Sequence, residues 1–465
     1  MSDFSAVFTR RHPLVHQYQS VWNRCRDAYS GGREYLEHAL IKHVSEVSLE
    51  FEERKQRAYY FNYPRKVARI IAQFLLAETP QRTHADPALI EDFSRSGLRT
   101  GEVMRQVATY INCFGMAWLL VDMPRFSGEL DLSRKQREGI RPYARALNPW
   151  EVADWAYAPD GRLAWALVDE WSIDRSDPFT TPEPRRRRRL WTRDNWQLFR
   201  QEADGRVTLE ETATHRLGEV PLIRCEEADG FGMHANHWFE DVVRISDAIL
   251  NAESEAQMNI IKQMFGLLVV SESFRAADFS SRDTAEGEKF SHVLARSAAL
   301  WESPEEKGIT RYISPGGTST EAIRNEITNL KRELFDVVGL GVQHDSDVAQ
   351  TAEAKAWDHY NVSQFLLSRV DMLEQAEAKA WELMHRWDPS VPVPFVSYNR
   401  EFSIVDLKDS IAALLNLNAF APTGEFRREV SRAALKLLAR IKKIAPEVQA
   451  RIEAEIAAGT PSDAA

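Results

Sequence analysis

The stretch that decides the fold is NHWFEDVVRISDAILNAESEAQMNI, residues 236–260. Its apolar residues recur at steps of four and three, the spacing that places side chains along one side of an α-helix. They are Trp238, Val242, Ile245, Ile249, Ala252, Ala256 and Ile260. An unbroken stripe of this length predicts a long helix that begins near residue 236 and is packed along its length.

The sequence downstream predicts a strand, a small module and two more helices. Residues 265–271 predict a strand, and two further short strands at 298–301 and 309–313 complete a small α/β module. A shorter helix is expected after it, followed by a polar segment and a very long helix from about residue 351 to 387. The last part of the chain predicts helices again, ending in a short disordered tail.

The sequence upstream has a different pattern. Several short helices are expected between residues 12 and 109. Short apolar runs then alternate with turn signals such as Asp160-Gly161, which predicts a mostly antiparallel sheet. The fold class is therefore α+β, mainly helical, with the sheet in the N-terminal half.

Composition limits the class of protein. A chain of 465 residues predicts roughly three compact units. The net charge of −10 argues against a protein that grips nucleic acid over a broad basic face. Cys25, Cys113 and Cys225 fit no zinc or disulfide spacing, which favours a reducing cytoplasm. No signal pattern opens the chain, and no apolar run approaches the ~20 residues of a membrane span.

Motifs for nucleotide binding or hydrolysis were sought, and neither a P-loop nor HExxH nor GxSxG occurs. His234, His237 and Glu240 are best interpreted as polar residues where a helix begins. A second polar group leaves open a metal-dependent nuclease or phosphohydrolase, and its members are His344, Asp345, Asp347 and His359. No cofactor is predicted.

Two basic segments stand out in this acidic chain. The run Arg185 to Arg189 predicts a solvated loop entering an edge strand, with a contact to nucleic acid or to an acidic neighbour as the alternative. Near the C-terminus the charge asymmetry favours contact with nucleic acid. The basic residues there are Arg427, Arg428, Arg432, Lys436, Arg440, Lys442, Lys443 and Arg451.

The order of these elements resembles the portal protein family of tailed bacteriophages, the head-to-tail connector. Local strings agree with it: YYFNYP at 59–64, LNPWEV at 147–152 with LAWALV at 163–168, and LGEVPLI at 217–223. FDVVGLGV at 335–342, followed by TAEAK at 351–355, is similar to the family's tunnel-loop region and the start of the helix after it.

The resemblance implies a wing, stem, clip and crown. Its boundaries are 1–234 for the wing, 235–264 for the first stem helix, 265–317 for the clip, 318–338 for the second stem helix, 339–350 for the tunnel loop, 351–388 for the long helix, 389–458 for the crown and wing-returning helices, and 459–465 for the disordered tail. The tunnel-loop residues implied to face DNA are Gln343, His344, Asp345, Ser346, Asp347 and Gln350.

The resemblance also implies a function without enzymatic activity. The chain would form a ring, twelve-fold in the virion, at one capsid vertex, through which double-stranded DNA enters during packaging and leaves on ejection. Terminase would dock on it first, and adaptor or tail proteins later, while the major capsid or scaffold protein surrounds it. Localisation would be the virion, after assembly in the host cytoplasm, with no membrane partner.

A ring of identical copies needs two different contact faces on each copy. We therefore expect the first stem helix to offer a second apolar stripe to its neighbour, made of Val243, Leu250, Met258 and Ile261.

Overall fold

The computed structural model describes residues 4–44, 46–125, 132–173, 179, 184–202, 204–226, 238–264, 267–271, 299–302, 311–313, 317–338, 352–400, 402, 423–441 and 446–458. The chain divides into two compact units, Met1–Arg400 and Glu401–Ala465. Length alone predicts about three units. The count is lower because helices from the middle and end of the first 400 residues pack against the N-terminal elements.

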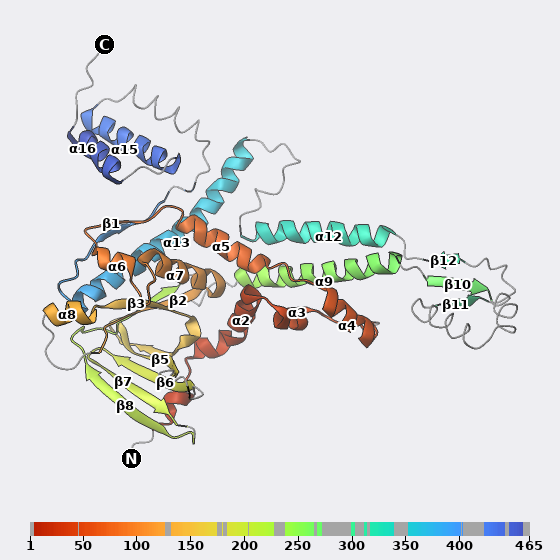
Figure 1. Ribbon diagram of the computed structural model, residues 1–465, viewed down its shortest axis with the longest axis horizontal. Coiled ribbons are helices and arrows are strands. Elements are labelled where there is room, and N and C mark those ends of the chain that lie inside the picture. The colour runs from red at the N-terminus through yellow and green to blue at the C-terminus, as the bar shows by residue number, and fades with distance from the viewer. Residues whose placement is uncertain are drawn as a thin grey trace, which may run out of the picture. The chain divides into compact units, whose positions relative to one another are not determined.

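The N-terminal region folds as short helices, as predicted (Figure 1). Their ends follow from local sequence: the His12 side chain caps α2, Pro13 occupies its first turn, and Gly31 at φ +65° ends it. The helices are α1 (Ala6–Thr9), α2 (Pro13–Ser30), α3 (Arg33–Ala39), α4 (Ser48–Arg57), α5 (Tyr63–Leu75), α6 (Pro87–Glu91), α7 (Thr100–Phe114) and α8 (Leu132–Glu138).

The described strands between residues 116 and 226 are antiparallel, as predicted, but they form two sheets and not one. In the first, the fully buried β2 (Met116–Asp122) lies between β3 (Tyr143–Leu147) and β9 (Leu222–Glu226). A 3-10 turn at Pro149–Glu151 then separates β3 from the second sheet. That sheet is a five-stranded meander of β4 (Val152–Tyr157), β5 (Leu163–Ile173), β6 (Pro184–Thr192), β7 (Asn195–Gln201) and β8 (Val207–Thr214).

The five-arginine run is not a solvated loop entering an edge strand, because it forms part of β6, the middle strand of the meander. Arg188 is fully buried and pairs with Asp169 on the neighbouring strand β5. Arg189 pairs with Asp122 and Glu170. The alternative of acidic neighbours is therefore confirmed for these arginines, whose charges are neutralised inside the fold.

The helix predicted from residues 236–260 is α9 (Trp238–Met264), and it lies beside the antiparallel α12 (Gly317–Asp336) (Figure 1). Between them in sequence lies a three-stranded sheet. Its central strand β10 (Leu267–Ser271) runs parallel to β11 (Ala299–Glu302) and antiparallel to β12 (Arg311–Ile313).

The very long predicted helix is α13 (Ala352–Trp387), whose 36 residues extend about 54 Å. It packs against β2, β9, α5 and α7, and therefore runs through the core formed by the N-terminal elements. A short sheet ties the chain after it to the N-terminal region, because β13 (Phe395–Ser397) pairs with β1 (Gln81–Thr83). The second unit contains α15 (Gly424–Ile441) packed against α16 (Pro446–Ala458).

A buried charge network fixes α13 in this core. Arg82 donates two hydrogen bonds to the Glu377 carboxylate, at 2.5 and 3.0 Å, and Glu377 is completely buried. The Tyr398 hydroxyl also donates to Glu377, at 2.6 Å, as does the Trp381 indole at 3.2 Å. Burial and the negative charge of Glu377 raise the pKa of Tyr398, so its phenol stays protonated as a donor.

Glu377→Gln tests this network. We expect the free energy of unfolding to fall by about 3–5 kcal/mol, because Arg82 would be left buried without its counter-charge. Urea denaturation would measure it. Glu37→Gln, in an exposed pair with Arg33, is the control and should change stability by less than about 0.5 kcal/mol. Equal losses for the two variants would contradict the assignment.

The arginine run offers a second test. Arg188→Ala should destabilise the protein by about 3–5 kcal/mol, because Asp169 and the carbonyl oxygens of Val7 and Arg10 lose their buried donor. Arg185→Ala, at an exposed position of the same strand, should stay within about 0.5 kcal/mol of wild type. A loss of DNA affinity in Arg188→Ala with unchanged stability would show instead that this arginine contacts nucleic acid.

Candidate functional site

The described part of the chain holds no cluster of side chains that could bind a metal ion. There, no three His, Cys, Asp or Glu side chains come together in a way that could hold an ion. His234 and His237 lie outside the described residues. Glu240 belongs to the first turn of α9, where it accepts a hydrogen bond of 2.7 Å from Arg244.

The polar group that left an enzyme open is only partly placed. His344, Asp345 and Asp347 lie outside the described residues, as do the other tunnel-loop residues Gln343, Ser346 and Gln350. His359 belongs to α13, and only its backbone is described. Both roles of this segment, tunnel loop and metal site, therefore remain predictions.

The basic residues near the C-terminus belong mainly to α15. Arg427 and Arg432 are exposed, Arg428 is half-buried, and Arg432 pairs with Glu429 one turn earlier. Lys436 and Arg440 are in the same helix with only their backbone described, while Lys442 and Lys443 lie outside the described residues. Arg451 is exposed on α16. Contact of these residues with DNA stays a prediction.

The α9–α12 pair is the part of the fold with the most extended surface contact between helices. Ile249 and Ala256 of α9 are buried, as are Ile327 and Leu334 of α12. Polar contacts set the register of the two helices. Gln263 donates to Thr320 at 2.9 Å, and Lys331 pairs with Glu253 at 3.3 Å. An antiparallel pair held at both of these points presents fixed outer surfaces to other molecules.

The second apolar stripe of α9 was expected to face another copy, and for half of its residues this is wrong. Val243 is completely buried and Leu250 is 3 % exposed within the single chain. Leu36 and Leu40, from α3 and the residue that follows it, cover Leu250, with Phe51 of α4 alongside. Periodicity reports that a residue is buried but not which partner buries it, and here the chain's own N-terminal helices do so. Met258 and Ile261 remain half-buried.

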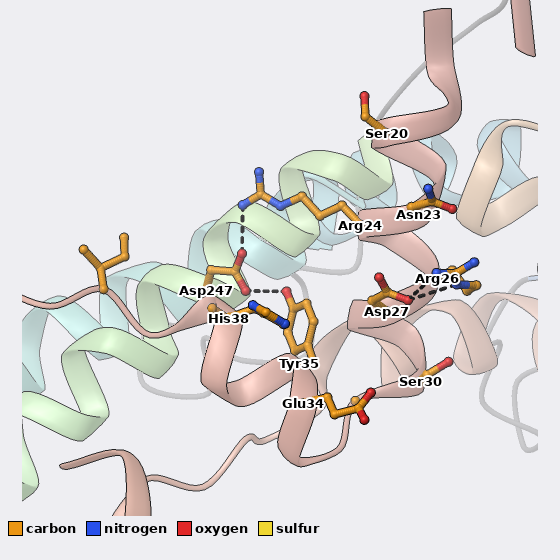
Figure 2. Close-up of a pocket in the computed structure, with 13 residues that line it drawn as sticks. Ser20, Asn23, Arg24, Arg26, Asp27, Ser30, Glu34, Tyr35, His38 and Asp247 are labelled. Atoms are coloured by element: carbon orange, nitrogen blue, oxygen red, sulfur yellow. Dashed lines mark hydrogen bonds and ion pairs between the residues drawn. The ribbon is translucent and has the colours of Figure 1, made fainter. Parts of the chain in front are cut away.

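Charged contacts hold the N-terminal helices on α9. Asp247 of α9 accepts hydrogen bonds from Arg24 of α2 at 2.8 Å and from the Tyr35 hydroxyl of α3 at 2.5 Å (Figure 2). Burial raises the pKa of Tyr35, and the Asp247 carboxylate raises it further. The phenol therefore remains a proton donor, and Asp247 joins three helices.

These same residues line an open pocket of about 720 Å³ between α2, α3 and α9. Four of its charged groups pair with each other, Arg24 with Asp247 and Arg26 with Asp27 (Figure 2). The first of these ion pairs connects α2 with α9, and together they neutralise most of the charge in the pocket, while Glu34 also lines it.

A second clamp fixes the connection between α3 and α4. Arg54, with 3 % of its side chain exposed, binds both carboxylate oxygens of Glu46 at 2.8 Å. The same guanidinium donates to the Ser254 hydroxyl at 2.9 Å and to the carbonyl oxygen of Ile41 at 2.6 Å. Asn251 of α9 accepts from the Ile41 amide at 2.9 Å. Ile41 is thus bonded directly to α9, and Glu46 is connected to α9 through Arg54.

Sequence reasoning missed the surface that this clamp supports. Ile41, Val44, Val47 and Leu49 are all largely exposed, although their side chains are apolar. The signal was four apolar residues in nine positions with neither helical nor strand spacing, which a search by periodicity does not detect.

No helix in the described part of the chain is long and apolar enough to cross a membrane. The three cysteines are free and buried.

Glu46→Gln tests the Arg54 clamp through its pH dependence. Hydrogen bonds from Arg54 hold the pKa of the Glu46 carboxyl below its usual value. The clamp therefore contributes fully above the usual pKa of a glutamate carboxyl and weakens as the pH falls through the lowered pKa of Glu46. We expect the variant to exchange the Ile41 amide hydrogen faster than wild type at neutral pH, with the difference vanishing in acid.

Hydrogen exchange followed by mass spectrometry measures this difference. Glu53→Gln, an exposed change in the same helix α4, is the matched control and should behave as wild type at every pH. A gap between Glu46→Gln and wild type that stays constant into acid would mean that the carboxylate charge does not hold the segment.

Comparison with known proteins gave likenesses in structure but none in sequence. No protein-family model and no curated protein matches the chain. A chain from the neck of a native gene transfer agent particle, computed with C12 symmetry, is 13 % identical over 80 % of this chain and 90 % of its own, with a TM-score of 0.43. A chain from the virion of a native gene transfer agent particle is also 13 % identical, over 86 % and 98 %, with a TM-score of 0.41. TM-scores below 0.5 carry no argument about function.

Proposed function

We propose that this chain is the subunit of a phage-type portal ring, a channel for double-stranded DNA at one capsid vertex. One observation carries the proposal: the antiparallel pair α9–α12, joined through the three-stranded sheet of β10–β12 and followed by α13, which returns through the N-terminal core. This is the order of stem helix, clip, stem helix and long helix that the resemblance in sequence implies.

The charge of the chain supports a channel that DNA passes without being held. Binding to DNA gains strength when lysines and arginines displace phosphate counterions. Each copy carries −10, so twelve copies carry about −120 and repel DNA over most of the ring. In β6 the arginine run adds little to DNA binding, because three of its members, Arg187, Arg188 and Arg189, pair with carboxylates of the same chain.

In this proposal the chain is a conduit and a docking platform, not an enzyme. The tunnel loop at 339–350 contains no lysine or arginine, so it contacts the DNA backbone through weak, exchangeable hydrogen bonds. The basic residues of α15 face packaged DNA. ATP hydrolysis belongs to the terminase that docks during packaging, before adaptor or tail proteins take its place in the virion.

Electron microscopy of the purified protein tests the proposal. We expect ring-shaped particles with a central hole in negative stain, and a mass of many subunits by light scattering. A monomer that cleaves DNA or phosphate esters in a metal-dependent way would overturn the portal assignment. It would favour the enzyme that uses His344, Asp345, Asp347 and His359.

A further inference from the structure

An exposed apolar surface lies beside α9, on the connection between α3 and α4. Val44 is 99 % exposed, Ile41 and Leu49 are each 71 % exposed, and Val47 is 64 % exposed. We name these four residues the α3–α4 patch. Single exposed apolar residues are ordinary, but four within nine positions of one short connection are a local excess of the kind that marks an interaction site.

The α3–α4 patch is held in place before any partner arrives. The Asn251 side chain binds the Ile41 amide, and Arg54, itself bonded to Ser254 of α9, binds the Ile41 carbonyl oxygen, so the patch is anchored to α9 at its first residue. Fixing an exposed loop costs conformational entropy, and this cost is then not incurred on binding. A loop whose apolar side chains are exposed while its backbone is clamped is therefore prepared for a contact.

A second apolar surface lies on α12. Ile323 and Leu330 are half-buried, and Val337, just after the helix, is 41 % exposed. They follow one another at intervals of seven residues, so they line one flank of the helix beside its buried stripe. We name these three residues the α12 flank.

On the other side of α12, residues near the end of the helix are contacted by α5. Lys66 of α5 lies over the Phe335 ring at 5.9 Å, and Lys331 lies beside Tyr63. On a helical wheel, Lys331 and Phe335 fall on the side of the buried stripe opposite to Leu330. The chain thus supplies a partner for one flank and leaves the other partly exposed.

The two surfaces lie at the same level along α9. Ile41 is bonded to Asn251, and the Arg54 clamp is bonded to Ser254. Lys331, the neighbour of Leu330, is paired with Glu253. In the proposed ring, α9 is the first stem helix and runs along the ring axis. Rotation about that axis keeps every residue at its height, so two surfaces that meet across a ring contact lie at one level.

Their charges are complementary. Lys42 lies within the α3–α4 patch, between Ile41 and Val44. The exposed carboxylates of Glu326 and Glu333 border the α12 flank at positions adjacent to Leu330 on the helical wheel. Opposite charges at the edge of an apolar contact steer association and fix its register.

We propose that the α3–α4 patch of one copy docks on the α12 flank of the next copy, and that this contact joins neighbouring subunits. The occupant of the patch is thus a second copy of this chain. The contact is heterologous, since each copy uses one surface on either side of its own α9–α12 pair, and it rests on the ring proposed above. This contact replaces the one between neighbouring subunits that we expected from Val243 and Leu250.

Disulfide trapping tests the contact. Val44→Cys combined with Leu330→Cys should give, after oxidation, a ladder of cross-linked copies on a non-reducing gel. Thr328→Cys replaces Leu330→Cys in the matched control, because residue 328 is exposed on the far side of α12 and should give no ladder. The native cysteines do not interfere, since burial raises the pKa of Cys25 and of Cys225 to about 12 and that of Cys113 as well.

A charge reversal gives an independent readout. Val44→Asp removes an apolar contact and places a carboxylate opposite Glu326 and Glu333. We expect it to raise the protein concentration needed for ring formation by about tenfold or more. Its thermal unfolding should match that of the wild-type subunit, because Val44 makes almost no contact within its own chain.

The outcomes separate this inference from the proposed function. Wild-type rings that persist in Val44→Asp and give no ladder with Val44→Cys and Leu330→Cys would overturn the contact while leaving the portal ring intact. Wild-type protein that never forms rings would overturn the proposed function itself. A ladder confined to the Leu330 pair, together with weakened rings in Val44→Asp, would establish the contact.

Discussion

Helix α9 is the element on which the rest of the first unit depends, because it is covered on two sides by different parts of the chain. Toward α12 it offers an apolar stripe and Glu253. Toward the N-terminal helices it offers Asp247, Asn251 and Ser254, each of which binds a group from α2, α3 or α4. A polar residue left unpaired in such a contact would cost about 1–3 kcal/mol. The positions of the N-terminal helices are therefore specified by hydrogen bonds and not by apolar packing alone.

Much of the fold was predictable from the sequence because its signals are local. The stripe in α9 and the length of α13 follow from helical periodicity, and the strands follow from short apolar runs between turn signals. The division of the strands into two sheets was not predictable, since it depends on which strands pair. The arginine run misled for a similar reason: the carboxylates that neutralise it, such as Asp122 and Asp169, are far away in sequence.

The candidate surfaces were predictable only in part. The sequence placed Val243 and Leu250 on a second apolar stripe of α9, which we expected to face a neighbouring copy. Both residues are buried within the single chain. Burial by the same chain and burial by a neighbour give the same periodicity, so the pattern could not distinguish them. The α3–α4 patch has no periodicity at all. The patch stands out because its side chains are exposed while the buried Arg54 holds the Ile41 backbone. Arg54 in turn binds Ser254, which lies 200 residues further along the chain.

The buried pair of Arg82 and Glu377 joins residues 295 positions apart. At a synthesis rate of about 5–20 residues per second, a ribosome takes roughly 15–60 s to make the chain between them. Until then the N-terminal core lacks the helix that packs through it. A nascent chain therefore cannot complete the first unit until translation has passed the end of α13.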